Sequence, residues 1–234
     1  MTLIGKGVDG LKKYWLSGAL LLLLLLTLSG CFFREPEDLY QSPEQSADYL
    51  SLTQTIRNVK DSLAQEYGVE VEDVSVMSGD NTALIQLQDL DRDGERETAV
   101  TFFRVSEAEK PLKIYFFTRT AEDTYTVSAM VEGNGTAIYR VDYVDLNGSG
   151  CKEVVVSWQM STGVYLLGAY SLEEAMVRSL QYAASAPAGS ASAQGLPDRE
   201  ALRATEWMTT VYDNYALYDL DQDTRTELAV VRVD

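Results

Sequence analysis

The sequence predicts a mainly β fold, built from a repeated unit of four short strands and preceded by one amphipathic helix. Two observations favour this fold. From residue 82 onward, short apolar runs rich in β-branched and aromatic residues alternate with turn signals, which is typical of strands. Three acidic loops with one common pattern recur along the same part of the chain, each directly between two such runs.

The acidic loops are residues 89–97 (loop one), 145–153 (loop two) and 219–227 (loop three). Each has an oxygen-bearing side chain at positions one, three and five, and a glutamate at position nine. Alternate side chains of a tight loop converge on one side, and Ca²⁺ prefers six to eight oxygen ligands. With the backbone carbonyl of position seven included, the predicted calcium ligands are Asp89, Asp91, Asp93, Glu95 and Glu97 in loop one, Asp145, Asn147, Ser149, Cys151 and Glu153 in loop two, and Asp219, Asp221, Asp223, Arg225 and Glu227 in loop three.

The three loops differ in their ligands. Loop one offers four carboxylates, whereas loop two offers two, so loop two should bind a cation more weakly. Loop three has Thr224 at position six, where the other loops have Gly94 and Gly150. A positive φ at this position costs a β-branched residue about 1 kcal/mol or more, so we expect loop three to be distorted or metal-poor.

Two other kinds of acidic loop resemble this pattern, the EF-hand and the metal-free hairpin turn. An EF-hand needs a glutamate at position twelve and flanking helices, whereas here the glutamate is at position nine and the flanks are β-like. A set of acidic hairpin turns without any metal stays open, because Asp-Gly and Asn-Gly are common turn formers.

Around the loops, the chain divides into repeats at residues 82–132, 133–182 and, partially, 200–234, with a low-complexity insertion at 183–199. In each complete repeat the order is strand, acidic loop, strand, strand, strand, which is the sequence signature of a β-propeller blade. The predicted strands are 81–88, 98–105, 112–118 and 124–131, then 137–144, 154–160, 164–170 and 176–182, then 215–218 and 228–233, with a short helix within 198–208.

This pattern, an acidic loop whose glutamate leads directly into a β run, resembles the FG-GAP/VCBS repeats of calcium-binding propellers over residues 82–234. The resemblance implies an incomplete β-propeller-like array of about two and a half four-stranded blades. A propeller closes with typically 4–8 blades. We therefore expect that the chain is truncated, or that a second chain completes the array of sheets.

Residues 1–30 have the features of a lipoprotein signal peptide, with a basic start and an apolar segment at 14–28 that is short for a membrane span. The segment ends in Leu-Ser-Gly-Cys, which resembles a bacterial lipobox and implies lipid on Cys31. Residues 31–45 are polar, contain two prolines and are interpreted as a tether. Together with the repeats, these features resemble bacterial VCBS-repeat lipoproteins anchored at the outer face of the cytoplasmic membrane.

Residues 46–81 are predicted to hold the helix and a lead-in to the first strand. Apolar residues over 47–67 step by three and four, which places them on one face of a helix. Gly68 is the expected helix end. We expect this helix to cover one end or edge of a sheet.

Composition excludes several classes of function. Acidic residues outnumber basic ones 36 to 19, which argues against binding nucleic acid. The sequence contains no histidine, so Ser-His, Cys-His and His-ligated zinc chemistry are excluded, and Cys151 has no activating base. The leading hypothesis is a surface-anchored binding or scaffold module for a protein or glycan ligand. A carbohydrate-active hydrolase that uses Asp or Glu, and a purely structural envelope protein, stay open as alternatives.

Overall fold

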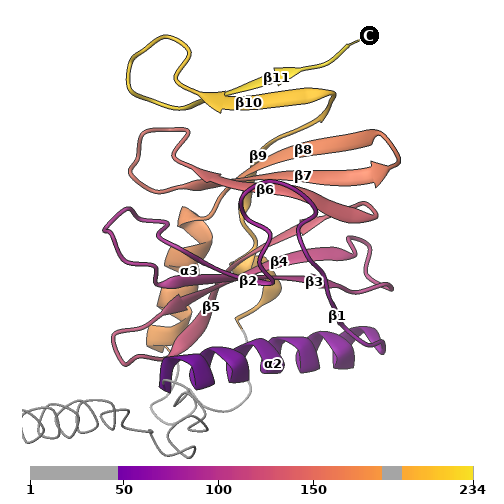
Figure 1. Ribbon diagram of the computed structural model, residues 1–234. Helices are drawn as coiled ribbons and strands as arrows, with labels where there is room; N and C mark the ends of the chain where they lie inside the picture. The colour runs from indigo at the N-terminus through magenta and orange to yellow at the C-terminus, as the bar shows by residue number, and fades with distance from the viewer. Residues whose placement is uncertain (1–46, 186–196, 234) are drawn as a thin grey trace, which may run out of the picture. The chain divides into compact units, whose positions relative to one another are not determined.

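Three antiparallel sheets lie face to face in the computed structural model, which describes residues 47–185 and 197–233 (Figure 1). The prediction of a mainly β fold is therefore confirmed. The predicted signal peptide, the tether and Cys31 lie outside the described residues, as do residues 186–196 of the insertion. A propeller stays a prediction, because three sheets do not by themselves make a closed ring.

The predicted helix is present as α2 (Ala47–Tyr67) and ends as expected at Gly68, whose φ is +70°. The Gly68 amide donates a hydrogen bond to the Ala64 carbonyl at 2.9 Å, which closes the last turn. Leu52, Val59 and Leu63 are buried and pack on the first sheet. The helix thus covers a face of the sheet rather than its end or edge.

The first sheet is formed by β1 (Glu72–Asp73), β2 (Ile85–Gln88), β3 (Thr98–Arg104), β4 (Leu112–Arg119) and β5 (Tyr125–Gly133). The two short strands β1 and β2 both pair with β3. Strands β3 to β5 are buried along almost their whole length. This burial explains their continuous apolar runs, because α2 covers one face of the sheet and the second sheet covers the other.

The second sheet has the order β6 (Ala137–Val144), β7 (Glu153–Ser161), β8 (Val164–Ser171) and β9 (Thr205–Tyr212). The predicted strand at 176–182 is wrong, since this segment belongs to α3 (Glu173–Ser185). Glu173 and Glu174 stand in the first turn of α3, where acidic side chains stabilise a helix. Ala175 and Ser179 are buried at helical spacing.

The fourth strand of the second sheet therefore comes from beyond the insertion. β9 pairs with β8 in antiparallel register, for example Leu167 with Thr210. The helix predicted within 198–208 is confirmed only as the short α4 (Arg199–Leu202), and the remainder of that segment begins β9. The second repeat consequently extends past residue 182 and includes residues that were assigned to the third.

The third sheet consists of β10 (Asn214–Tyr218) and β11 (Glu227–Val231), joined by loop three. Two apolar cores hold the three sheets together. One lies between the first and second sheets and includes Phe102, Phe116 and Trp158. The other lies between the second and third sheets, where Leu167 and Tyr212 meet residues of β10 and β11. Packing between sheet faces thus stabilises the stack.

The connection from β1 to β2 also joins the first two sheets. The amides of Met77 and Ser78 donate hydrogen bonds to the carbonyls of Ile138 and Tyr139 in β6, at 3.1 and 2.8 Å. The side chain of Asn81 donates to the carbonyl of Val141 at 3.0 Å. This segment therefore runs along the edge of the second sheet, and β2 is shorter than the predicted strand 81–88.

Gly133→Ala is expected to lower the free energy of unfolding by about 1–3 kcal/mol. A Cβ atom at Gly133 would lie 2.4 Å from the ring of Trp158, which is fully buried between the sheets. Urea denaturation measures the loss. The same substitution in a Trp158→Leu background should cost less, because the ring is gone. Equal losses in both backgrounds would show that the ring is not the cause.

Candidate metal sites

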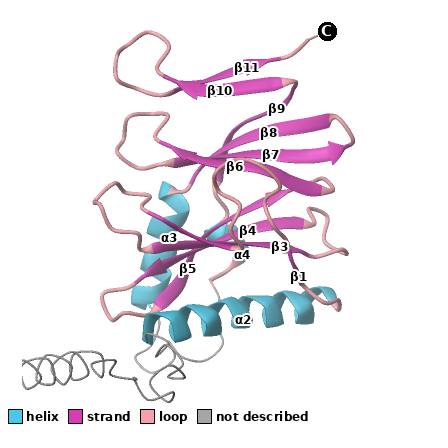
Figure 2. Ribbon diagram, viewed as in Figure 1, coloured by secondary structure: helices cyan, strands magenta, loops and turns pink. Residues whose placement is uncertain are grey.

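The three acidic loops lie on one side of the stack of sheets, and each joins the first two strands of a repeat (Figure 1, Figure 2). Loop one connects β2 to β3, loop two connects β6 to β7, and loop three connects β10 to β11. The face-to-face packing of the sheets therefore brings equivalent loops next to one another. The common register of the loops in the sequence predicted one such loop per repeat, whereas their placement side by side follows from the stacking of the sheets.

All three loops share one backbone conformation. Positions four and six have positive φ values in each loop, namely Arg92 (62°) and Gly94 (96°), Gly148 (71°) and Gly150 (94°), and Gln222 (64°) and Thr224 (74°). Loop three is therefore not distorted. Thr224 adopts the positive φ that the equivalent positions of loops one and two reach with Gly94 and Gly150. The positive φ at position four was missed, because arginine and glutamine do not signal it.

Hydrogen bonds within the loops explain why positions one, three and five need oxygen-bearing side chains. These side chains accept from the backbone amides of positions six, five and seven respectively. The three equivalent pairs from position six to position one are Gly94 to Asp89 (3.1 Å), Gly150 to Asp145 (3.1 Å) and Thr224 to Asp219 (2.9 Å). Because backbone amides of the turn donate to several of these oxygens, a carboxylate oxygen that is left without a donor is the stronger sign of a metal site.

Loop one contains carboxylate oxygens without a hydrogen-bond donor in the described part of the chain. Asp89, Asp91, Asp93 and Glu97 each place a carboxylate oxygen within 4.8 Å of the others. Asp89 Oδ1 and Glu97 Oε2 are buried and have no hydrogen-bond partner among the described residues. A buried carboxylate oxygen without a donor is strongly unfavourable. The pKa of Glu97 is raised by burial and, further, by the charges of Asp91 and Asp93. A bound cation would relieve each of these costs.

Loop three gathers the same four groups, Asp219, Asp221, Asp223 and Glu227, within the same 4.8 Å. Glu227 differs from Glu97 because its Oε2 accepts a hydrogen bond from the Leu220 amide at 2.6 Å. Both clusters fit a hard cation with oxygen ligands. The carbonyl ligands predicted at Glu95 and Arg225 stay predictions.

Loop two differs because its glutamate and its Ser149 hydroxyl have hydrogen-bond partners. The Glu153 carboxylate accepts from the Leu146 amide at 2.7 Å and from the Asn147 side-chain amide at 3.1 Å, so both oxygens have donors. The hydroxyl of Ser149 donates to Glu173 Oε1 at 2.7 Å. The predicted ligands Asp145, Asn147, Ser149 and Glu153 therefore satisfy one another and their neighbours. Glu173 was not predicted at this site, because no helix was expected to begin there and residues 176–182 were expected to form a strand.

Loop one and loop two are in direct contact. Lys152 of loop two donates to loop one twice, from Nζ to the Asp89 carbonyl at 2.6 Å and from its amide to the Leu90 carbonyl at 2.7 Å. Arg92 Nη1 of loop one lies 3.0 Å from Asp145 Oδ2 of loop two. These contacts connect the first two sheets at the loop side of the stack.

Cys151, at position seven of loop two, has features that argue against a nucleophile. Burial raises the pKa of its thiol, and the neighbouring Glu173 carboxylate raises it further. The thiol is therefore protonated at neutral pH, and no histidine exists to activate it. Its predicted role as a carbonyl ligand is not tested by these contacts.

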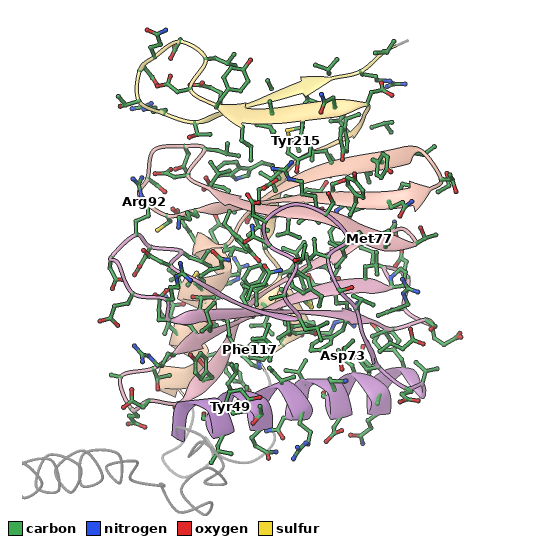
Figure 3. The ribbon with its side chains drawn as sticks, viewed as in Figure 1. Tyr49, Asp73, Met77, Arg92, Phe117 and Tyr215 are labelled. Atoms are coloured by element: carbon green, nitrogen blue, oxygen red, sulfur yellow. The ribbon has the colours of Figure 1, made fainter. Side chains whose placement is uncertain are left out.

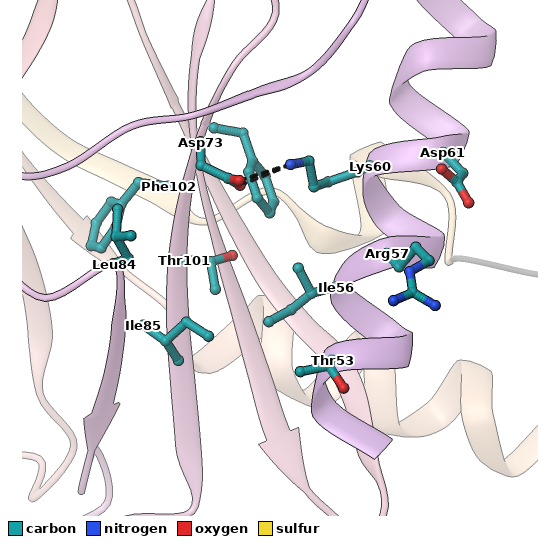
Figure 4. Close-up of a pocket in the computed structure, with 11 residues that line it drawn as sticks. Thr53, Ile56, Arg57, Lys60, Asp61, Asp73, Leu84, Ile85, Thr101 and Phe102 are labelled. Atoms are coloured by element: carbon teal, nitrogen blue, oxygen red, sulfur yellow. Dashed lines mark hydrogen bonds and ion pairs between the residues drawn. The ribbon is translucent and has the colours of Figure 1, made fainter. Parts of the chain in front are cut away.

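A groove of about 370 Å³ lies between α2 and the β2 edge of the first sheet (Figure 4). Its lining is mostly apolar, and it contains the ion pair of Lys60 with Asp73 at 2.9 Å. Thr101 is buried there, and its hydroxyl has no partner among the described residues. The two carboxylates of the lining are Asp61 and Asp73, and Asp73 is held by Lys60, so the groove lacks a free carboxylate pair for glycoside hydrolysis.

Comparisons of this chain with protein-family models, curated proteins and solved structures give no match. The resemblance to FG-GAP/VCBS repeats therefore depends on the loop pattern alone. In the part of the chain that the structure describes, no helix is both long and apolar enough to cross a bilayer.

Thr224→Gly is expected to stabilise the protein by about 1 kcal/mol, because glycine adopts a φ of +74° without steric cost. Thr226→Gly, two residues further on, should give no such gain, since Thr226 is not among the residues with positive φ. Thermal unfolding of both variants in the absence of calcium measures the difference. Equal effects at the two positions would contradict the proposed strain.

Proposed function

We propose that this protein is a lipid-anchored, extracytoplasmic bacterial lipoprotein whose β repeats are stabilised by calcium and serve as a binding or scaffold module. The observation that supports the calcium role is in loop one, where two buried carboxylate oxygens have no donor among the described residues. The same cluster of four carboxylates recurs in loop three. A repeated site at equivalent places in two sheets favours a structural ion over a catalytic one.

In loop one, Asp89, Asp91, Asp93 and Glu97 would hold the ion, with the carbonyl of Glu95 as a further ligand. In loop three the corresponding residues are Asp219, Asp221, Asp223 and Glu227, with the carbonyl of Arg225. The calcium ion would supply positive charge that offsets four neighbouring carboxylates. The metal would thereby fix the two strands that each loop connects.

A binding module is favoured over a hydrolase by the placement of the carboxyl groups. A general acid needs a raised pKa, and burial raises the pKa of Glu97 and of Glu153. Both glutamates lie at position nine of an acidic loop. Glu132, a buried carboxylate outside the loops, has a lowered pKa because the ion pairs with Lys113 and Arg199 outweigh its burial. Glu132 lines a small pocket, but Lys113, Arg199 and Arg203 hold it there as a carboxylate, so it is not free to act as an acid.

The ligand function is tested with the soluble chain that starts after Cys31, immobilised and incubated with an extract of the bacterial envelope and with a panel of glycans. We expect one protein or glycan to be retained with calcium and released by EDTA. Hydrolysis of a glycan on the panel would support the hydrolase alternative instead. Retention of nothing in either buffer would favour the purely structural alternative.

The anchor is tested separately with Cys31→Ala in the full-length chain. Labelled fatty acid should be incorporated by the wild type and lost in the variant, because the proposed lipid attaches to this cysteine. In membrane fractionation, the wild type should be found with the membranes and Cys31→Ala in the soluble fraction. Incorporation that persists in Cys31→Ala would contradict lipidation at this residue.

A further inference from the structure

We propose that loop two is a calcium-independent member of the series, in which the guanidinium of Arg92 from loop one takes the place of a metal ion. This inference rests on the proposed calcium role of loops one and three. It would make the first two sheets depend on each other, because the cation of one loop is a side chain of the other.

The contacts of Asp145, at position one of loop two, carry this inference. Its Oδ1 accepts from the Gly148 amide at 2.7 Å. Its Oδ2 accepts from the Gly150 amide at 3.1 Å and from Arg92 Nη1 at 3.0 Å. The equivalent Asp89 of loop one has a buried Oδ1 without a donor. Both oxygens of Asp145 therefore have donors, and one of these donors carries a full positive charge.

The charges of the two loops agree with this difference. Loop one has four carboxylates at its ligand positions, whereas loop two has Asp145 and Glu153 only. A single guanidinium offsets a larger share of the charge in loop two than it would in loop one. The carboxylate of Glu173 approaches loop two from α3 through Ser149, so a third acidic group is close by.

The position of Arg92 is set by the loop that carries it. Position four has a φ of 62°, and the side chain extends from loop one to loop two (Figure 3). An ordinary surface ion pair contributes little, since both charges are well hydrated when apart. Here the side chain of Asp145 is only 11% exposed, while that of Arg92 is 59% exposed. Loss of Arg92 would therefore leave a half-buried carboxylate without its charged partner, whose place calcium would take.

Arg92→Gln tests the inference in the full chain, with calcium as the only added ligand. Equilibrium dialysis with labelled calcium counts the ions bound by the wild type, Arg92→Gln, Arg92→Lys and Arg96→Gln. Arg96 is the matched control, because it lies in the same loop, is exposed and changes the net charge equally. We expect one additional equivalent in Arg92→Gln and none in Arg92→Lys or Arg96→Gln. Asp145→Asn added to Arg92→Gln should remove the additional equivalent.

The additional calcium ion expected in Arg92→Gln tests the inference about loop two, whereas the number of ions bound by the wild type tests the proposed function. No increment in a folded Arg92→Gln variant, or the same increment in Arg96→Gln, would overturn the inference about loop two. A wild type that binds no calcium would contradict the proposed function instead, whatever the increment. Thermal unfolding in EDTA adds a second readout: Arg92→Gln should melt lower than Arg96→Gln, and excess calcium should remove the difference.

Discussion

Glu132→Ala is expected to lower the free energy of unfolding by about 3–5 kcal/mol, because it leaves a buried ammonium group without its partner. Glu132 in β5 and Lys113 in β4 are opposite each other in the register of the first sheet, and they form a buried ion pair. Their side chains are 4% and 1% exposed. Urea denaturation at neutral pH measures the loss.

Glu132 also connects the sheet to α4. Its second oxygen accepts from Arg203 Nη2 at 3.0 Å, and Arg199 donates both to Glu132 and, at 2.6 Å, to Glu66 of α2. Burial alone would raise the pKa of Glu132, but Lys113 and Arg199 outweigh it and hold the pKa below its ordinary value. Glu132 therefore contributes stability above the pKa of the unfolded chain, and this contribution is lost as the pH falls through the lower folded pKa.

Two controls separate the buried pair from a general effect of losing a charge. Glu122→Ala, in the exposed turn between β4 and β5, should change stability by less than about 0.5 kcal/mol. The double variant Lys113→Met with Glu132→Met should be more stable than Glu132→Ala, because it also removes the buried ammonium group, whereas Arg199 and Arg203 lose the same partner in both variants. If Glu132→Ala lowered the free energy of unfolding no more than Glu122→Ala does, the role of the buried pair would be refuted.

Glu97→Gln is expected to remove the calcium-dependent stabilisation that loop one provides. A ligand specific to the native state stabilises it by about 2.7 kcal/mol at 100 times its Kd. For a chain of this length, one such site raises the melting temperature by about 5–10 °C. Melting curves of the wild type and Glu97→Gln, each with EDTA and with saturating calcium, measure the difference in calcium response.

Glu95→Gln is the matched control, because Glu95 lies in the same loop but directs its carboxylate to Arg119 at 3.0 Å. Its predicted ligand is the backbone carbonyl, which the substitution keeps. The calcium response of Glu95→Gln should therefore equal that of the wild type. If Glu97→Gln kept the full response, or if both variants lost it equally, loop one would not be the site that we infer.

Local signals in the sequence predicted much of this architecture. The stripe of α2 and its end at Gly68 depend on residues close in the chain, as do the strands that flank each acidic loop. The clusters of loops one and three were predicted for the same reason, since all four side chains of each lie within nine consecutive residues. Where one short segment determines the structure, its pattern was sufficient.

Features that depend on distant parts of the chain were not predicted. The α3 segment has short apolar spacing that suits either a strand or a helix, and only the pairing of β9 with β8 decides between them. Lys113 stands within an apolar run, and the sequence does not indicate that Glu132 is its partner. The contact of Arg92 with Asp145 likewise follows from the stacking of two sheets.

Calcium titration of the melting temperature of the wild-type protein tests the central claim most directly. Loops one and three each hold four carboxylates within 4.8 Å, and loop one leaves two buried oxygens without donors among the described residues. The proposed structural role predicts that the melting temperature rises with calcium concentration and falls again on addition of EDTA. A melting temperature that stays the same from EDTA to millimolar calcium would contradict it.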